Sequence, residues 1–297
     1  MQRALLASLL AGVACGLIGT WIVLRGLTFI GDALAHGVVP GLAASAVLGI
    51  NPVLGAVLSA AVMVGGITIV QRRARFGSDT AIGLLFVGML SVGVLIMSRS
   101  TSFAGDLTGF LFGGITGIRT GDLLLGAGVA VTVLVATVIG FRAFLVLSFN
   151  ADAAKVMGLR PGLTHAVMLI LVTATIVASF KSVGSLLVFA LITAPAAAAV
   201  QVVRRVPLVL VASVVFAEMS VVIGLLLAWH ANLAPGAAMA STAVVIFLIV
   251  LVGSEVTARF RRRAAVDDLE ADGDDQVVGD IAGSGVAQGD LAEPSLP

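Results

Sequence analysis

Charged residues are scarce in this chain of 297 residues: Lys, Arg, Asp and Glu together make up 11% of it, against about 25% in an ordinary soluble domain. Cysteine is nearly absent, because Cys15 is the only one. A single cysteine excludes an intramolecular disulfide and a metal site built from several cysteines. Segments of about ten residues with alternating hydrophobicity, which a transmembrane barrel requires, are also missing.

Recognisable catalytic motifs are missing as well. The sequence contains no Gly-x-x-x-x-Gly-Lys-Ser/Thr phosphate loop, so the chain has no recognisable means of its own to hydrolyse ATP. A serine nucleophile elbow and a His-Glu-x-x-His zinc motif do not occur either. We therefore expect a protein that is not itself an enzyme and holds no permanently bound cofactor.

Long hydrophobic runs follow one another along most of the chain. Hydrophobic residues make up 59% of the sequence, and the mean hydropathy is +1.16. A spanning helix needs roughly 20 mostly apolar residues, and backbone polar groups in lipid must be paired internally. The runs therefore predict an all-α integral membrane protein with eight or nine transmembrane helices. The predicted spans are 4–24, 28–50, 52–70, 81–98, 120–140, 163–180, 184–200, 207–229 and 235–253.

Two segments differ from these spans. Residues 100–118 combine aromatic residues with glycines and predict a short helix or a re-entrant segment. Residues 264–297 contain acidic residues and neither Lys nor Arg, and they are too polar to bury a core. The sequence thus predicts a transmembrane domain over 1–263 and a disordered acidic tail over 264–297. A solvated tail without a specific role is the simpler interpretation, and a cation-gathering or regulatory role is the alternative.

The basic residues predict the orientation of the spans, since cytoplasmic loops hold an excess of Lys and Arg. If the loop after the first span is cytoplasmic, most of the 17 basic residues fall on the cytoplasmic side. They are Arg25, Arg72, Arg73, Arg75, Arg142, Lys155, Arg160, Arg204, Arg205, Arg259, Arg261, Arg262 and Arg263. With nine spans, this orientation places the N-terminus outside and the C-terminus in the cytoplasm.

Asp32 and His36 are the most informative pair of ionisable residues at membrane depth. Such residues are costly to bury and point to function by default. The i,i+4 spacing puts both side chains on one face of a helix, where a carboxylate and an imidazole make two contacts to a divalent transition metal. The alternative is a structural pair, in which Asp32 offsets the helix dipole and hydrogen-bonds His36.

Glu218 lies near the middle of its predicted span, far from other charges. A lone carboxylate at that depth should face a bundle interior or an aqueous cavity. It is either a third metal ligand or a protonated carboxyl that bonds a neighbouring helix. The other two histidines are weaker candidates: we expect His165 to be a capping or interface residue at a helix start, and His230 to end its span at the outer face.

Two further features concern helix ends and breaks. A capping residue, Asn150 or Asp152, opens a short Ala-rich helix that contains Ala154 and stops at Gly158. A short amphipathic helix on the cytoplasmic face is either a docking element for another protein or an ordinary connector. Pro195 interrupts the helical hydrogen bonds of its span, so a kink or break is expected there. Broken helices in transporters commonly line the substrate path.

Four patches make the sequence from about Arg3 to Arg263 resemble a known family. They are Leu24-Arg25 through Gly31-Asp32-Ala33-Leu34-Ala35-His36 to Pro40-Gly41, Asp79-Thr80-Ala81-Ile82-Gly83, Asp106-Leu107 through Phe112-Gly113, and Val183-Gly184-Ser185-Leu186-Leu187 through Ala194-Pro195-Ala196. The family comprises the permeases of binding-protein-dependent ABC importers for zinc, manganese or iron. The resemblance implies an importer-type permease bundle in the bacterial cytoplasmic membrane. It also implies a second copy of the chain, two cytoplasmic ATPase subunits and an external metal-binding protein.

The resemblance also implies roles for particular residues. Asp32 and His36 match positions that line the metal path, and Ala154 to Gly158 looks like the coupling helix that contacts the ATPase. The expected function is that of the permease in an ATP-driven importer of a divalent metal, with zinc favoured over manganese. The chain is expected to contact membrane lipid and to bind no nucleic acid. The rivals are an ion-gradient-driven secondary transporter, a permease for a metal chelate, and a structural membrane protein.

Overall fold

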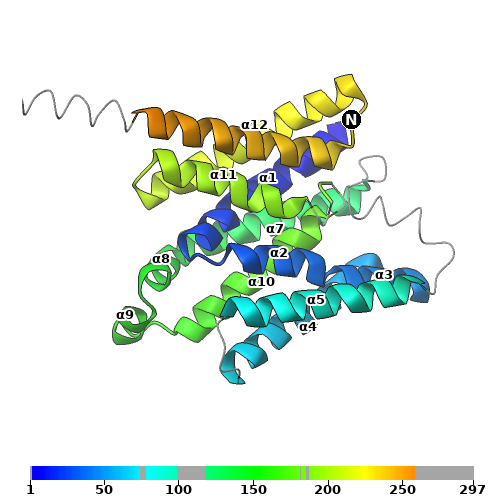
Figure 1. Cartoon of the computed structure of the whole chain (residues 1–297), viewed down its shortest axis with the longest axis horizontal. Coiled ribbons are helices and arrows are strands. Elements are labelled where there is room, and N and C mark those ends of the chain that lie inside the picture. Colours follow the sequence, from blue (N-terminus) through cyan, green and yellow to red (C-terminus); the bar gives the residue numbers. More distant parts are fainter. Residues whose placement is uncertain (1, 74–77, 99–117, 181, 185–186, 258–297) are drawn as a thin grey trace, which may run out of the picture. The chain divides into compact units, whose positions relative to one another are not determined.

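The computed structural model describes residues 2–73, 78–98, 118–180, 182–184 and 187–257, and every regular element within these ranges is a helix (Figure 1). The helices are α1 (Gln2–Leu24), α2 (Thr28–Gly37), α3 (Val39–Leu48), α4 (Pro52–Arg73), α5 (Ser78–Ser98), α7 (Thr120–Ile139), α8 (Phe141–Phe149), α9 (Ala151–Val156), α10 (Pro161–Ser179), α11 (Val188–Val202), α12 (Val206–Ala231) and a last helix, Pro235–Thr257. The expected all-α class is confirmed.

Most of these helices are apolar enough to cross a membrane. Among the described residues, seven segments reach the length and hydropathy of a span, and Ile82–Ser98 and Val188–Val202 are apolar but shorter. A multi-pass membrane protein is therefore confirmed, whereas the count of eight or nine spans stays a prediction. The expected re-entrant segment at 100–118 falls almost entirely outside the described residues, and so does the tail 264–297. The contacts of the chain divide it at Leu251, within the last helix, and residues 1–250 form one compact unit.

Helix α1 is the central helix of the unit formed by residues 1–250. It packs against α7, α10, α11 and α12. Its sequence is apolar on all sides, which is typical of a helix surrounded by other helices. Trp21 is fully buried, and its ring lies 5.6 Å from that of Phe141 and 5.4 Å from that of Phe144. Glycines allow the closest approach of α1 to its neighbours, because a Cβ on Gly16 would lie 2.8 Å from the Cα of Val214 on α12. Small residues at crossings are typical of helix packing in membranes.

The predicted span 28–50 consists of two helices, α2 and α3, with Val38 between them. Pro40, in the first turn of α3, explains the break: it has no N–H to donate to the carbonyl of His36 four residues earlier. Beyond the break, α3 and α4 approach so closely at Gly41 and Gly55 that a side chain at either position would meet the other's backbone. The sequence placed this break elsewhere, at Pro195.

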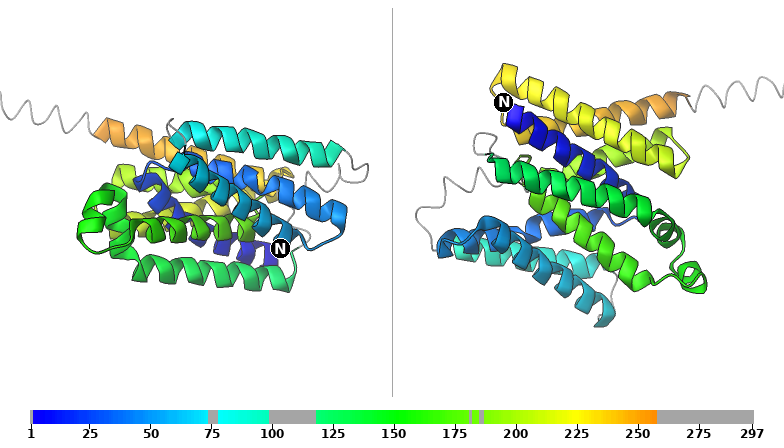
Figure 2. Two further views of the ribbon diagram at one scale, coloured as in Figure 1. Left: turned by 90° about the horizontal axis from the view of Figure 1, so that it is seen from below. Right: turned by 180° about the vertical axis from the view of Figure 1, so that it is seen from behind.

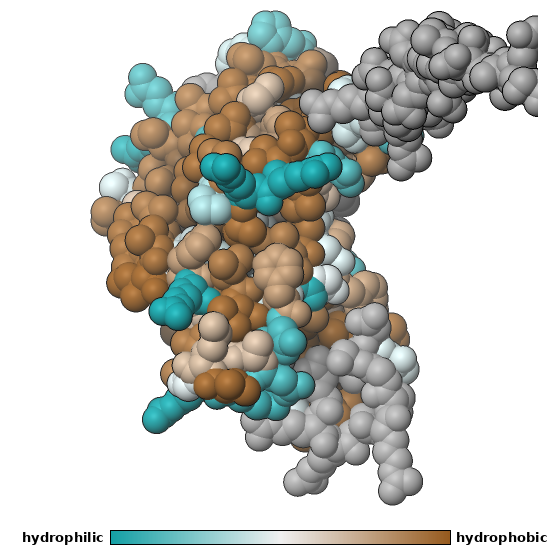
Figure 3. Space-filling view, turned by 90° about the vertical axis from the view of Figure 1, so that its left-hand side faces the viewer, coloured by the Kyte–Doolittle hydropathy of each residue, from teal (hydrophilic) through white to brown (hydrophobic). Residues whose placement is uncertain are grey.

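The surface of the described helices is largely apolar. Figure 3 shows hydrophobic residues covering most of one face, with hydrophilic residues in separate small groups. The exposed apolar side chains include Leu124, Val131, Val138 and Ile139 on α7 and Leu226 on α12. A lipid environment needs no polar covering, so an apolar exterior fits helices that span a bilayer.

Candidate functional site

Asp32 and His36 lie one turn apart on α2 and project together. His36 Nε2 is 3.5 Å from Asp32 Oδ1, and the side chains of His36 and Asp32 are 16% and 25% exposed. The pair is therefore half-buried and not sealed. Two ligand atoms that each lie roughly 2.1 Å from one ion are at most about 4.2 Å apart, so their separation suits two ligands of one divalent ion. The predicted common face is confirmed, and the metal role stays a prediction.

The surroundings of His36 fix its ring. The ring of Phe86 on α5 meets it edge to face, with centroids 4.8 Å apart and planes at 88°. His36 Nδ1 is buried and has no hydrogen-bond partner among the described residues. A neutral imidazole offers one bare nitrogen to a metal, and here Nε2 is the nitrogen beside the carboxylate. Because α2 ends at Gly37, directly after His36, the pair occupies the last turns of a short helix.

Glu218 lies apart from this pair, on α12 against α1. A Cβ on Gly12 of α1 would lie 2.6 Å from Glu218 Oε1, so the carboxyl occupies the space that the glycine leaves. Glu218 Oε1 is buried and has no hydrogen-bond partner in the described part of the chain. Among the described residues, no group of three or more His, Cys, Asp and Glu side chains comes close enough to hold a metal. This conformation thus does not assemble Glu218 with Asp32 and His36 as a third ligand.

Pro195 differs from its prediction. It is buried within α11, which runs from Val188 to Val202 without a break. The expected break at Pro195 is therefore wrong, whereas a kink there stays a prediction. Buried neighbours on both sides, Ile192 and Ala196 among them, hold the helix in place. A single missing hydrogen bond in an apolar helix is tolerated when packing surrounds it.

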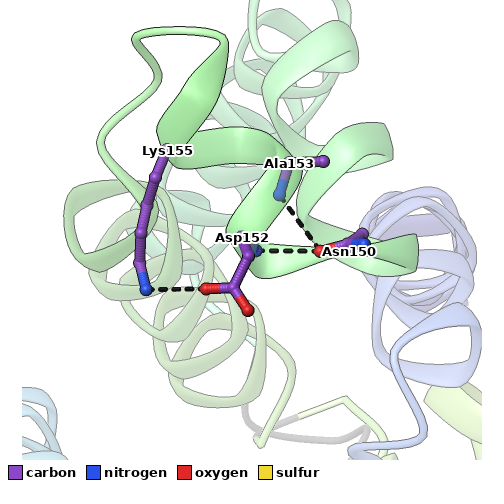
Figure 4. A network of polar contacts seen from close by, with 4 residues as sticks. All are labelled: Asn150, Asp152, Ala153 and Lys155. Carbon is purple, nitrogen blue, oxygen red and sulfur yellow. Dashed lines mark hydrogen bonds and ion pairs between the residues drawn. The ribbon is translucent and has the colours of Figure 1, made fainter.

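The short helix α9 has the ends that its sequence predicts (Figure 4). Asn150 Oδ1 accepts hydrogen bonds from the backbone N–H groups of Asp152 at 2.9 Å and Ala153 at 3.0 Å, which is the N-cap arrangement. At the other end Gly158 has φ +73°, and the N–H of Leu159 donates to the carbonyl of Ala154. A left-handed glycine with this bond closes a helix efficiently.

Charged and apolar side chains of α9 face solvent. Lys155 Nζ lies 2.8 Å from Asp152 Oδ1, and this hydrogen-bonded ammonium holds the pKa of the Asp152 carboxyl below its ordinary value. Ala154 is buried, while Val156 and Met157 are 90% and 58% exposed. Figures 1 and 2 show α8 and α9 together at one end of α7. An exposed apolar tip on a capped helix suits contact with another protein.

A large groove elsewhere is unsuited to a cation. It has a volume of about 620 Å³ and lies between α1, α7 and α12. Its lining is apolar apart from Thr137, with Leu17, Leu134, Leu210 and Val214 among the described residues that form it. Without an ionisable or carbonyl-rich lining, a desolvated metal ion finds no ligands there. The groove therefore does not compete with Asp32 and His36 as a metal site.

One contact that the sequence did not indicate involves Arg25, in the turn between α1 and α2. Its Nη1 lies 3.0 Å from Nδ1 of His165, in the second turn of α10. Of the two roles predicted for His165, capping or interface, this contact confirms the interface role. His230, by contrast, is exposed near the end of α12, with Nδ1 2.8 Å from the carbonyl of Leu226 on the same helix. No sequence pattern links positions 140 residues apart, so tertiary structure was needed to find this contact.

Comparison with known proteins shows what the chain is similar to. The model of the ABC 3 transport family matches residues 1–254. The manganese transport system membrane protein MntC of Listeria monocytogenes is 34% identical over 252 residues, which cover 85% of this chain and 90% of MntC. A probable iron transport system membrane protein of Haemophilus influenzae is 31% identical over 259 residues, which cover 87% of this chain and 95% of that protein.

A solved structure shows the same arrangement of helices. The structure of PsaBC from Streptococcus pneumoniae in complex with Fab matches with a TM-score of 0.76 and 32% sequence identity. The match covers 84% of this chain and 90% of the chain in that structure.

Proposed function

The chain belongs to the ABC 3 transport family, and on that premise we propose that it imports manganese through a path that includes Asp32 and His36. The observation that carries this proposal is the half-buried carboxylate and imidazole pair on α2, 3.5 Å apart within a membrane-spanning segment. Ionisable residues at that depth mark ion pathways.

The general role follows from the family. The chain is a membrane-spanning permease of a metal importer of the ABC class, a transport component whose ATP is hydrolysed by a separate subunit. The sequence favoured zinc over manganese. The relatives described above are a manganese protein and an iron protein, so the preference for zinc has no support from them. Manganese therefore replaces zinc in the proposal, and its affinity for carboxylate oxygen suits Asp32.

The proposed site holds its ion weakly. Asp32 and His36 supply two ligands, and water or groups of a second copy of the chain complete the coordination. A transport site must bind tightly enough to admit an ion and weakly enough to release it. An incomplete set of protein ligands meets that requirement, because fewer fixed ligands lower the affinity of the site for the ion.

The proposed partners follow the same logic. Cytoplasmic ATPase subunits contact α9, whose exposed Val156 and Met157 form an apolar tip. An external metal-binding protein delivers the ion, and two permease copies in the bacterial cytoplasmic membrane enclose the path. ATP binding moves the coupling helices and rocks the two copies between outward and inward access. The C-terminus then lies in the cytoplasm, in agreement with the distribution of Lys and Arg.

Uptake of radioactive manganese into proteoliposomes tests the path. The permease is reconstituted with its ATPase subunits and binding protein, and Asp32→Asn is compared with the wild type and with Glu255→Gln. Glu255 is an exposed carboxylate near the end of the last helix and serves as the matched control. Of the two variants, only Asp32→Asn should reduce uptake strongly, by roughly 100-fold, while its complex still assembles and hydrolyses ATP. Normal uptake by Asp32→Asn would show that the path lies elsewhere.

The same preparation separates the rival functions. Uptake by the permease alone, driven by an ion gradient without ATP, would indicate a secondary transporter. Uptake of an iron chelate with exclusion of free manganese would indicate a chelate permease. Gly158→Leu tests the docking role of α9, since φ +73° strains any residue with a side chain. We expect this variant to hydrolyse ATP without uptake, and normal uptake would contradict the assignment of α9.

A further inference from the structure

The contact between Arg25 and His165 joins two parts of the chain that carry different tasks in the proposed transport cycle. Arg25 belongs to the turn that precedes α2, and His165 belongs to α10, which follows α9. The α1–α2 turn lies at the same end of the unit as α8 and α9 (Figures 1 and 2). Arg25 Nη1 lies 3.0 Å from His165 Nδ1, and it also lies 3.4 Å from the sulfur of Met168, one turn further along α10.

The backbone around Arg25 is fixed. Gly26 has φ +64°, and the N–H of Leu27 donates to the carbonyl of Ile22 at 3.0 Å. These features are those of a glycine-closed helix end, so the α1–α2 turn has one defined shape. This turn connects Arg25 to Thr28, the first residue of α2, over three residues.

The chemistry of the contact gives it a direction. A guanidinium has only donors, so His165 must accept through Nδ1 and hold its ring proton on Nε2. Partial burial lowers the pKa of Arg25, and among the described residues no carboxylate forms an ion pair with it. A half-buried cation without a carboxylate partner depends on its neutral acceptors, and the imidazole of His165 is a stronger acceptor than the sulfur of Met168.

Hydrogen bonds between neighbouring segments connect α9 to α10, which carries this contact. The linker after α9 is tied to that helix by the bond from Leu159 N–H to the Ala154 carbonyl. The first turn of α10 is tied to the linker, since Thr164 Oγ1 donates to the Arg160 carbonyl at 3.2 Å. His165 is the next residue.

On the other side of the contact, α2 begins three residues after Arg25. Helix α2 also packs directly against α10. Asp32 lies in the second turn of α2, and His36 one turn later.

We propose that Arg25 and His165 are positioning residues that transmit the movement of α9 and α10 to α2 and thereby reorient Asp32 and His36. This inference rests on the proposed function for its cargo and for the contact of α9 with the ATPase subunits. Loss of the contact should leave ATP hydrolysis and complex assembly in place and stop α2 from responding to nucleotide.

Hydrogen exchange of the assembled complex tests the link. The permease with its ATPase subunits is measured without nucleotide and with ATP and vanadate, and exchange is followed in peptides from α2 and α9. In the wild type both helices should respond to nucleotide. In His165→Ala only α9 should respond. The matched control is His230→Ala, because His230 is exposed and its hydrogen bond is to the carbonyl of Leu226 on its own helix, and α2 of this variant should respond as in the wild type.

A conservative variant separates coupling from stability. In His165→Asn the amide oxygen replaces Nδ1 as an acceptor at a similar distance from the backbone, so the response of α2 should return. Manganese transported per ATP hydrolysed should fall at least about tenfold in His165→Ala and Arg25→Ala, the loss expected for one hydrogen bond to a charged group. In His165→Asn the ratio should stay within about twofold of the wild type.

Three outcomes would overturn the inference: no response of α2 in the wild type, a normal response in His165→Ala, or equal losses in His165→Ala and His165→Asn. The cargo is judged separately. If α2 responds as described but manganese is not transported, the proposed function fails and the link between α10 and α2 holds.

Discussion

Asp32 and Glu218 are both carboxylates within membrane-spanning helices, and their surroundings differ. Asp32 lies beside an imidazole and is a quarter exposed. Glu218 lies over Gly12, with one carboxyl oxygen buried and without a hydrogen-bond partner among the residues that the structure describes. Depth in the membrane alone therefore does not identify a metal ligand. A neighbouring imidazole distinguishes the Asp32 region from the Glu218 region, and both carboxylates belong to partly exposed residues.

The largest effect should come from the Asp32 region. Asp32→Asn and His36→Ala should each reduce manganese uptake by roughly 100-fold, which corresponds to about 3 kcal/mol. The double variant should be little worse than either single variant, because residues that act on one ion are strongly non-additive. Uptake assays at equal protein level measure this. Fully additive losses would show that the two side chains act on different steps.

The next effect concerns the packing that encloses Glu218. Gly16→Ala places a Cβ against the backbone of α12, and overpacking of this kind costs about 1–3 kcal/mol. Gly12→Ala meets mainly the flexible end of Glu218, with the Cγ2 of Val221 at 3.3 Å, so its cost should be smaller and should fall in a Glu218→Ala background. Melting temperatures of the purified permease in detergent measure both. Equal losses for the two glycines, unchanged by Glu218→Ala, would contradict this description of the α1–α12 contact.

A smaller effect is expected from Glu218 itself. Glu218→Gln keeps the shape of the side chain and removes its charge, so uptake should stay within about threefold of the wild type if Glu218 is outside the path. The stability should be unchanged or higher, because a neutral amide costs less to bury than a carboxylate does. Loss of uptake comparable to that of Asp32→Asn would end the distinction between the two carboxylates and make Glu218 part of the path.

The smallest effect should come from removal of residues 264–297. Their composition cannot form a packed core, and neither carboxylate region depends on them in the proposed path. Truncation after Arg263 should leave manganese uptake intact at unchanged protein level. Loss of more than half of the uptake would assign the acidic tail a function in transport or assembly.

Local features of the molecule could be predicted from the sequence. The helical spans followed from apolar runs, since lipid forces backbone groups to pair within a helix. The shared face of Asp32 and His36 followed from helical spacing, and the cap of α9 from Asn150 and Gly158. These features depend on neighbours within a few residues. A kink or break was predicted at Pro195, and the break is wrong because packing around a proline decides whether its helix continues; the break lies before Pro40 instead.

The sequence by itself determined that this protein is helical, lies in a membrane, lacks its own ATPase motif and places a carboxylate beside an imidazole. Apolar length and i,i+4 spacing are local quantities, and they need no knowledge of the fold. Only the tertiary structure decided that Glu218 lies over Gly12 and apart from Asp32, and that Arg25 contacts His165. Those relations depend on how closely α1, α10 and α12 approach each other, and the interlocking of side chains from distant segments sets that distance.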